Sequence, residues 1–377
     1  MKIVYVIGYI HGWGGIERVL AGKANFLVNQ GYDVSFIKIY RNNDEPFFEF
    51  DPRIKFYGLD FPFEEQKGIK KKLNFGRNKQ LFLDKISDLL NEIKPDITIS
   101  TFCKYSKYIY LANDPSIKII ERHFAKYKRN QIFVKLDKLP FGKMISRLYR
   151  NKDYQIVKHF SKFIVLTDED RADWGNLNNI ETIHNPITFV PKSTSNCETK
   201  RAIALGRICK QKNYESMLRI WKKVTEKHSD WQLSIFANGG SVRKLQKYAD
   251  KLKVSSNVEI NPTTREVEKE LVNSSIYLMT SRYEGFPLVL LEAMACGLPV
   301  VTYACKCGPK DMIENGKDGF YVNQNDENSF VEKVNQLIEN ESLRKQIGVN
   351  AAQSIQQFSE EKVMAKWMNL FQTLVNK

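Results

Sequence analysis

The chain has 377 residues, 42% of them hydrophobic, and a formal net charge of +15. The hydrophobic content excludes a disordered chain, and the length favours two domains, since one domain usually holds about 100–200 residues. The longest apolar runs, such as residues 3–7, are much shorter than the roughly 18 residues of a membrane-spanning helix. The N-terminal residues lack the pattern of a cleaved signal peptide, so we expect a first strand there.

The first half of the chain alternates strand-like and helical segments. Apolar residues 2–8 precede a glycine-rich turn, and in the following segment apolar side chains recur at helical spacing over 16–29. Further apolar runs predict strands at residues 33–40, 96–101, 117–120 and 162–167. Alternation of strands and helices is typical of a parallel sheet.

The second half repeats this alternation with shorter connections. Asn213 stands where it would cap the first helix of this half. The predicted strands span 201–208, 231–237, 257–260, 275–281, 299–303 and 319–322, and the predicted helices span 213–228, 241–253, 264–273 and 287–297. The whole chain therefore predicts two doubly wound α/β domains.

A polar stretch rich in Pro, Ser and Thr, residues 188–200, predicts the linker between these domains. We expect the first domain over 1–190 and the second over 191–359. The last segment, 360–377, predicts an amphipathic helix that needs a packing partner for its apolar face. This face carries Val363, Trp367, Leu370, Phe371 and Leu374.

Two groups of possible metal ligands have simpler explanations. Cys296, Cys305 and Cys307 do not have the spacing of a zinc site. The acids of 168–170 follow an apolar strand and begin a helix that Thr167 would cap, where acidic side chains are favourable without a metal. The six cysteines, without a signal peptide, favour reduced thiols. We therefore expect no metal ion, no cofactor and a cytoplasmic location.

The positive charge is concentrated in two segments. Residues 118–162 carry 13 Lys and Arg against three acids, and residues 66–79 add six basic residues and no acid. Apolar side chains are interspersed in the first segment: Ile132, Phe133, Leu136, Leu139, Phe141, Met144, Ile145 and Leu148. This mixture is typical of a surface that contacts an anionic membrane. The alternatives are a solvated basic face above a core-facing stripe, and a nucleic-acid-binding protein, for which no motif is present. We expect a peripheral membrane contact and no nucleic-acid partner.

The stretch SRYEGFPLVLLEAMACGLPVV predicts a helix that begins just after a strand. The strand ends near Ser281, Pro287 fits the first turn of the helix, and Gly297 is a natural stop. The free amides near Leu288 and Val289 would then form an anion site. They lie at the edge where open α/β sheets bind ligands.

Two acidic and two basic residues stand near this predicted anion site. Glu284 precedes the helix, and Glu292 lies about one and a half turns into it. Arg207 ends the first strand of the second half and Lys212 precedes the next helix, so both reach the same sheet edge. Two cations there suit a diphosphate leaving group. The simpler alternative is a capped helix with Glu284 in solvent, beside ordinary loop cations.

Together these residues resemble the retaining GT-B glycosyltransferases of family GT4. The resemblance is carried by Arg207 with Lys212 five residues later and by the paired glutamates of 284–301; residues 14–27 and the stretches FIVLTDEDRADW and IHNPI are also similar. It covers most of the chain, with gaps at 41–80 and 124–160. The resemblance implies two Rossmann-like domains facing across a cleft, with the C-terminal helix crossing back to the first domain.

The resemblance also implies how the donor would be held. Arg207 and Lys212 would bind the diphosphate of a nucleotide-sugar, together with the amides of Leu288 and Val289. Glu292 would bind the ribose hydroxyls.

Other matching residues would contact the transferred sugar. Glu284 would bind its hydroxyls with the amides of Gly285 and Phe286. Gly14 and Gly15 would let the donor and the acceptor approach the backbone closely. Arg207, Lys212 and Glu284 are thus the catalytic candidates.

Three further residues match the family more loosely. Arg122 and His123 fall roughly where the family often has a histidine that contacts the sugar. Asn185, in IHNPI, is another candidate contact.

The implied activity is transfer of a hexose or N-acetylhexosamine from a nucleotide-sugar, with UDP favoured, to a hydroxyl of a surface-polysaccharide or lipid-linked glycan. Family members retain the anomeric configuration, and the departing phosphate would accept the proton of the attacking hydroxyl. A sugar-nucleotide epimerase of the same architecture is the alternative enzyme. A hydride-transferring enzyme is not expected, because Glu17 stands where the dinucleotide fingerprint begun by Gly12 and Gly14 needs its third glycine.

Overall fold

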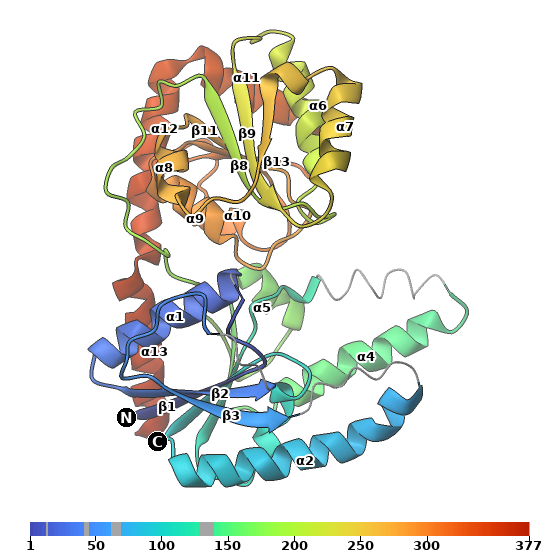
Figure 1. Ribbon diagram of the computed structural model, residues 1–377, viewed down its shortest axis with the longest axis vertical. Helices are drawn as coiled ribbons and strands as arrows, with labels where there is room; N and C mark the ends of the chain where they lie inside the picture. Colours follow the sequence, from blue (N-terminus) through green and yellow to red (C-terminus); the bar gives the residue numbers. More distant parts are fainter. Residues whose placement is uncertain (13, 41–44, 62–68, 128–138, 377) are drawn as a thin grey trace. The chain divides into compact units, whose positions relative to one another are not determined.

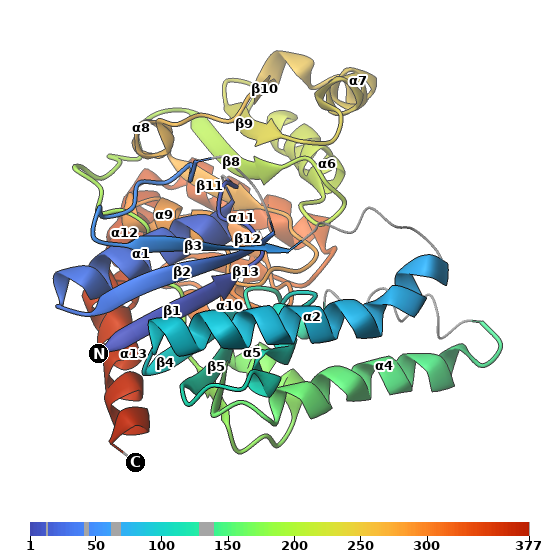
Figure 2. The same cartoon turned by 60° about the horizontal axis from the view of Figure 1, so that its bottom comes forward.

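The computed structural model describes residues 1–12, 14–40, 45–61, 69–127 and 139–376 (Figure 1). The chain divides into two compact units, Met1–Pro186 with Glu361–Lys377, and Ile187–Glu360. Each unit contains a parallel sheet covered by helices on both faces (Figures 1 and 2).

The first unit is built on a seven-stranded sheet. In spatial order the strands are β3 (Lys55–Phe61), β2 (Asp33–Tyr40), β1 (Lys2–Ile7), β4 (Ile97–Thr101), β5 (Ile117–Glu121), β6 (Lys162–Val165) and β7 (Ile180–Thr182). Every pair of neighbours is parallel. All carboxyl ends therefore meet at one edge, where the residues after each strand can form a site.

Two apolar cores cover the faces of this sheet. One core lies beneath the helices α2 (Ile69–Ile93), α4 (Gly142–Val157) and α5 (Asp168–Trp174), with the short 3₁₀ helix Ser106–Leu111. The other lies beneath α1 (Gly15–Asn29) and the C-terminal helix α13 (Glu360–Val375), which lie side by side on the sheet (Figure 1). The buried face of α13 is the one that the apolar spacing predicts: Val363, Trp367, Leu370 and Phe371 are buried, with Met364.

The second unit contains a six-stranded parallel sheet. In spatial order its strands are β10 (Val258–Asn261), β9 (Gln232–Asn238), β8 (Arg201–Arg207), β11 (Ile276–Met279), β12 (Val300–Tyr303) and β13 (Phe320–Val322). Its helices are α6 (Tyr214–Thr225), α7 (Val242–Leu252), α8 (Val267–Val272), α9 (Leu288–Ala295), α10 (Pro309–Met312), α11 (Glu327–Glu339) and α12 (Glu341–Ser354), followed by the 3₁₀ helix Ile355–Phe358. The core between the sheet and α6, α7 and α11 includes the fully buried Trp221.

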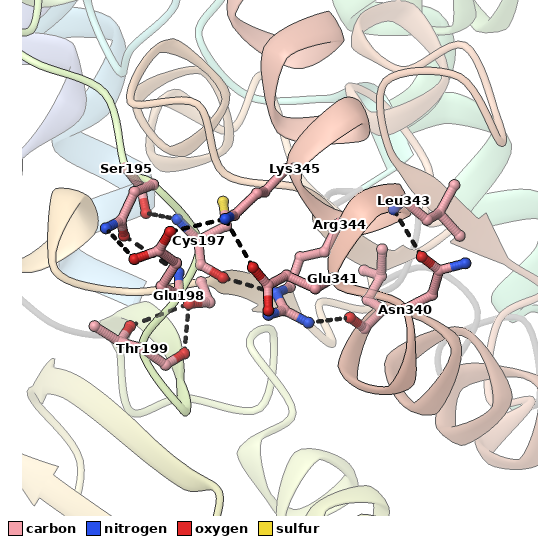
Figure 3. Close-up of polar contacts among 12 residues, drawn as sticks. Ser195, Cys197, Glu198, Thr199, Asn340, Glu341, Leu343, Arg344 and Lys345 are labelled. Atoms are coloured by element: carbon pink, nitrogen blue, oxygen red, sulfur yellow. Dashed lines mark hydrogen bonds and ion pairs between the residues drawn. The ribbon is translucent and has the colours of Figure 1, made fainter.

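The polar stretch expected as a linker, 188–200, is anchored on the second unit instead (Figure 3). Arg344 of α12 is buried and donates hydrogen bonds to the carbonyl oxygens of Cys197, Leu337 and Ile338 at 2.7–3.0 Å. Lys345 pairs with Glu198 at 2.7 Å. The boundary between the units accordingly falls after Pro186 and not after residue 190. The sequence did not reveal these contacts, because they are made by backbone carbonyl oxygens and by an exposed ion pair. Neither produces a recognisable apolar pattern, so the polar composition of the stretch indicated a linker.

Two strands that the sequence did not predict, β3 and β7, lie at the two edges of the first sheet. β3 contains Gly58 and Asp60, residue types that are depleted in strands, and β7 is only three residues long. Short or interrupted edge strands are common because they limit pairing with other chains. Their apolar signal is correspondingly weak.

The basic tract 118–162 does not form one continuous surface. Residues 128–138 lie outside the described residues, so Ile132, Phe133 and Leu136 do too. Lys118 and Arg122 are buried, and Lys118 pairs with Asp114 at 2.6 Å. These two cations are therefore not part of an exposed basic surface.

The other five apolar residues proposed for the membrane surface are exposed. Leu139, Phe141, Met144, Ile145 and Leu148, at the start of α4, are 58%, 79%, 60%, 38% and 64% accessible. From Phe141 to Leu148 they recur at helical spacing beside the exposed cations Lys143 and Arg147. The alternative of a core-facing stripe is therefore wrong for these five residues. In the part of the chain that the structure describes, no helix combines the length and the apolar character that crossing a membrane requires.

Candidate functional site

An ion pair joins two loops at the carboxyl edge of the second sheet. Lys212 follows β8, Glu284 follows β11, and these strands are neighbours. The Lys212 ammonium lies 2.9 Å from Glu284 Oε1, and Gln211 donates to Glu284 Oε2 at 3.1 Å. Glu284 is only 7% exposed, so the alternative in which it points into solvent is excluded. A buried carboxylate is stable here because both of its oxygens are partnered.

Gly206 allows Lys212 to take this position. Its φ of +150° is one that residues with side chains rarely adopt, and a Cβ on it would lie 2.9 Å from Lys212 Cε and 3.3 Å from Tyr214 Oη. The lysine side chain therefore passes directly over the backbone at the end of β8. Burial raises the pKa of Tyr214, with smaller contributions from Cys209 and Glu284, so its hydroxyl stays neutral.

Arg207, the last residue of β8, is exposed. Its side chain makes no hydrogen bond or ion pair with any residue that the structure describes. The structure thus brings Lys212 and Glu284 together and leaves the Arg207 guanidinium facing solvent at the end of the adjoining strand. An unpaired guanidinium carries five donors suited to a phosphate.

Helix α9 begins one residue later than expected, because Pro287 occupies its N-cap position. The first backbone hydrogen bonds at this end run from Leu290 and Leu291 to the Pro287 carbonyl oxygen. The amides of Leu288 and Val289 precede them, and both residues are half-buried. The helix ends in a Schellman motif, in which Leu298 and Gly297 donate to Ala293 and Met294.

The approach to α9 is fixed by packing. Gly308, with φ of +117°, lies so close to Pro287 that a Cβ would meet its Cδ at 2.3 Å. Phe286 is buried against Phe358 in an edge-to-face contact with ring centroids 5.7 Å apart. Gly285, between Glu284 and Phe286, is half-buried.

Glu292, in the second turn of α9, is 2% exposed. Thr188 donates to its Oε1 at 2.5 Å. Tyr277, on β11, has a fully buried hydroxyl without a hydrogen-bond partner among the described residues. Burial raises the pKa of Tyr277, and Tyr214, Glu284 and Glu292 raise it further, so Tyr277 remains a neutral donor near both glutamates.

In the first unit, the glycine turn leads directly into α1. Gly14 is the N-cap and Gly15 the first helical residue, and both are exposed. Gly14 has φ of −82°, so its conformation does not require glycine. Glu17, at the third helical position, folds back so that its carboxylate would meet a Cβ on Gly12 or Gly14 within 2.8 Å, as in a capping box.

The residues after β5 are buried. Arg122 donates from Nε to the Phe124 carbonyl oxygen at 2.7 Å and stacks on the ring of Trp174. His123 is 9% exposed, with Nε2 3.4 Å from Glu121 Oε1. Asn185 is also buried in this unit. All three loosely matched residues are therefore buried in the structure.

The acids of 168–170 behave as the first turn of a capped helix. Thr167 accepts from the Asp170 amide at 3.1 Å, and the Asp170 carboxylate accepts from the Lys126 amide at 2.7 Å. Asn213 precedes α6 as expected, but its side chain does not cap the helix. It accepts from Arg282 at 2.8 Å instead. Among the residues that the structure describes, no group of three or more His, Cys, Asp and Glu side chains is arranged to hold a metal ion.

Five contributors to these sites were missed from the sequence. Gln211 and Thr188 are polar loop residues whose contacts to Glu284 and Glu292 span more than 70 positions of the chain. Lys23 pairs with Glu121 from a helix whose pattern indicates only an apolar face. Tyr277 lies within an ordinary strand pattern. Only Gly206 had a local signal, since a glycine at the end of a strand indicates a close backbone approach.

The contact between Gly206 and Lys212 can be tested by stability measurements. We expect Gly206→Ala to lower the free energy of unfolding by about 1–3 kcal/mol, because the new Cβ strains the backbone and displaces Lys212. In a Lys212→Ala background the same change should cost less, since the obstructing side chain is gone. Urea unfolding of the four proteins measures both values.

Gly76→Ala is the matched control, because a Cβ at this exposed position of α2 meets no atom within 4 Å. We expect this change to be neutral or to stabilise by less than about 1 kcal/mol. If Gly206→Ala lowered the free energy of unfolding equally in both backgrounds, the close approach of Lys212 to Gly206 would be contradicted.

Comparison with known proteins identifies the family of this chain. Residues 188–354 match the model of the family described as "Glycosyl transferases group 1". The chain is 30% identical over 378 residues to an uncharacterized glycosyltransferase of Haemophilus influenzae, covering 98% of this chain and 99% of the relative. It is 24% identical to the lipopolysaccharide 1,6-galactosyltransferase of Salmonella typhimurium, covering 90% of each chain.

The fold agrees with these matches. The crystal structure of TarM superposes with a TM-score of 0.75 at 17% identity, over 98% of both chains. A mutant of S. aureus TarM was solved in complex with Fondaparinux, alpha-GlcNAc-glycerol and UDP. The two parallel α/β sheets, the match to the family model and the full-length relative together show that this chain is a GT4-like member of the group 1 glycosyltransferases, with the GT-B fold.

Proposed function

We propose that this glycosyltransferase moves a hexose or N-acetylhexosamine from a UDP-linked donor to a hydroxyl of a surface-polysaccharide or lipid-linked glycan, with retention of the anomeric configuration. The observation that carries the donor site is the Lys212–Glu284 pair at the carboxyl edge of the second sheet, beside the start of α9. It combines a positioned cation, a partnered carboxylate and helix amides within neighbouring loops.

In this proposal the second unit binds the donor. Arg207 and Lys212 neutralise the diphosphate, and the amides of Leu288 and Val289 add hydrogen bonds to it. The two cations stabilise the negative charge that develops on the leaving phosphate. In this proposal their positive charge takes the place of a metal ion. Glu292 binds the ribose hydroxyls, with Thr188 orienting its carboxylate.

Glu284 binds hydroxyls of the transferred sugar, together with the amides of Gly285 and Phe286. A carboxylate that already accepts from Lys212 and Gln211 retains lone pairs for a sugar hydroxyl. Its role is to orient the sugar; the acceptor hydroxyl attacks from the face that the phosphate leaves, and the phosphate takes its proton. Catalysis then depends on positioning and charge stabilisation.

The first unit contributes the remaining contacts. Gly14 and Gly15 carry no side chain beyond the backbone at the start of α1, so donor and acceptor can approach it closely. His123, Arg122 and Asn185 are the further candidates for contacts with the sugar or the acceptor. Of the three side chains, His123 keeps the largest exposed fraction, 9%.

The printed names of the relatives support the donor and the acceptor class. A TarM mutant was crystallised with UDP, and the Salmonella relative is named a lipopolysaccharide 1,6-galactosyltransferase. No match described above favours a sugar-nucleotide epimerase or a nucleic-acid-binding protein, so neither alternative is kept.

Arg207 offers a direct test of the donor site. Because its side chain is exposed, we expect Arg207→Ala to change the free energy of unfolding by less than about 0.5 kcal/mol. The rate of nucleotide release from UDP-sugars should nevertheless fall by about 10² or more, because a charge-stabilising donor is lost. Lys210→Ala, which removes another exposed cation of the same loop, is the matched control and should stay near the wild-type rate. A near-normal rate for Arg207→Ala would reject its role.

We also propose that the protein contacts anionic membranes from the cytoplasmic side through the start of α4. The exposed apolar residues Phe141, Met144 and Leu148 recur at helical spacing beside Lys143 and Arg147. Contiguous apolar exposure of this kind marks interaction surfaces, and flanking cations favour anionic lipid headgroups. The proposal includes the basic segment 66–79, of which residues 66–68 lie outside the described part of the chain and Arg77 and Lys79 are the basic side chains described.

Vesicle flotation tests the membrane contact. We expect binding to vesicles that contain anionic lipid, and loss of binding with rising salt because the charges are screened. Phe141→Ser with Leu148→Ser should weaken binding by more than about tenfold, since a buried apolar side chain of this size contributes about 1.5–3 kcal/mol. Val349→Ser, at an exposed apolar position of α12, is the control. Equal binding to neutral vesicles would contradict the electrostatic part, and unchanged binding of the double variant would contradict the role of α4.

A further inference from the structure

A buried ion pair lies directly behind His123 in the first unit. Lys23, on α1, is 2% exposed, and Glu121, the last residue of β5, is 1% exposed. The Lys23 ammonium lies 2.6 Å from Glu121 Oε2, while the other carboxylate oxygen lies 3.4 Å from His123 Nε2. One carboxylate therefore faces a lysine on one side and an imidazole on the other.

The lysine of this pair is enclosed by aromatic rings from two further elements. Its ammonium lies 3.7 Å from the ring centroid of Trp367, on α13, and 5.6 Å from that of Tyr5, on β1. Ring faces stabilise a desolvated cation. Removing a lysine from water is costly unless its charge is matched, and here one carboxylate and two rings match it.

The pair keeps the carboxylate ionised. Burial alone would raise the pKa of Glu121, but the charge and the hydrogen bond of Lys23, with a further contribution from the nearby His123, outweigh burial and hold the pKa at about 2. Burial lowers the pKa of Lys23, and Glu121 opposes this effect. An ionised carboxylate only accepts hydrogen bonds, so it favours a proton on the imidazole nitrogen that faces it.

His123 itself is unusual among the buried side chains. Neither of its ring nitrogens has a hydrogen-bond partner among the described residues. Buried polar groups in proteins are almost always partnered, so an exception needs a physical reason. A proton held at Nε2 by Glu121 leaves Nδ1 as an acceptor, which suits the hydroxyl of a ligand. The 3.4 Å separation from Glu121 is long for a hydrogen bond, and such bonds often shorten when substrate binds.

We infer that Lys23 and Glu121 are positioning residues that hold the His123 imidazole in the Nε2–H tautomer and in one orientation, so that Nδ1 accepts from a sugar hydroxyl. The inference rests on the proposed function, in which His123 contacts the sugar. A carboxylate that orients a histidine from behind is a common device, and its loss typically costs 10- to 100-fold at metal-bound histidines. The competing possibility is that the ion pair only stabilises the fold.

The decisive comparison uses Lys23→Met combined with Glu121→Gln. The double change removes both charges together, so no unpaired buried charge remains to unfold the protein. We expect kcat for transfer from a UDP-sugar to fall by about 10- to 100-fold, with little change in KM for the donor. In a His123→Ala background the same double change should lower kcat by less than about twofold, because the residue through which it acts is absent.

A second buried pair on the same strand provides the matched control. Lys118 and Asp114 lie 2.6 Å apart and are also shielded from solvent, but they face the opposite end of β5. Lys118→Met with Asp114→Asn should leave kcat within about twofold of wild type, as expected for a change remote from the site. The inference would be overturned if the double change lowered kcat by the same factor in the His123→Ala background as in the wild type. A normal kcat for the Lys23 and Glu121 double variant would overturn it too.

A spectroscopic readout separates this inference from the proposed function. The chain contains five histidines, so ¹⁵N-histidine labelling yields five imidazoles, and His123→Ala identifies the signal of His123. We expect the Nε2–H pattern in the wild type and a mixture of tautomers in the Lys23 and Glu121 double variant. An unchanged tautomer in the double variant would overturn the positioning role. Absence of transfer from every UDP-sugar, with the tautomer change present, would reject only the proposed function.

Discussion

The ion pair between Lys212 and Glu284 is the interaction on which the candidate donor site depends. It joins the loops after two neighbouring parallel strands, so the sheet itself sets the distance between cation and carboxylate. Gly206 provides the space that the lysine needs, and Gln211 partners the second carboxylate oxygen. Because these groups are held by the backbone and by each other, little reorganisation is needed when a diphosphate and a sugar bind.

The first unit repeats the same physical arrangement with another lysine and another glutamate. Glu121 ends a strand of a parallel sheet, and Lys23 holds its charge in a buried environment. The two pairs differ in their surroundings. The exposed Arg207 ends the strand that precedes Lys212, whereas the ring of Trp367, on α13, packs against the Lys23 ammonium. The C-terminal helix thus does more than cover an apolar face, since one of its rings completes the environment of a charge next to His123.

The sequence predicted the architecture well and the polar contacts poorly. All six strands of the second sheet and the amphipathic face of α13 have clear periodic patterns, and the start of α9 was wrong by a single residue. Edge strands β3 and β7 were missed because a strand that contains Gly58 and Asp60, or has three residues, carries little apolar signal. Thr188, Gln211 and Lys23 were missed because each contacts its glutamate across a long stretch of chain, and no local pattern encodes such a pairing. The exposure of Phe141 and Leu148 agrees with the expected surface, but the spacing left the core-facing alternative open, since an apolar stripe has the same spacing whether it faces a core or solvent.

Ligand-induced stabilisation tests most directly whether the edge of the second sheet binds a diphosphate. Tm would be measured for the wild type and for Arg207→Ala with UMP, UDP and UDP-sugars at equal concentration, because a ligand that binds only the folded state raises Tm more when it binds more tightly. We expect UDP and at least one UDP-sugar to raise the Tm of the wild type well above the value with UMP, and Arg207→Ala to lose most of that difference. Equal shifts with UMP and UDP, or an Arg207→Ala response like that of the wild type, would contradict the diphosphate site.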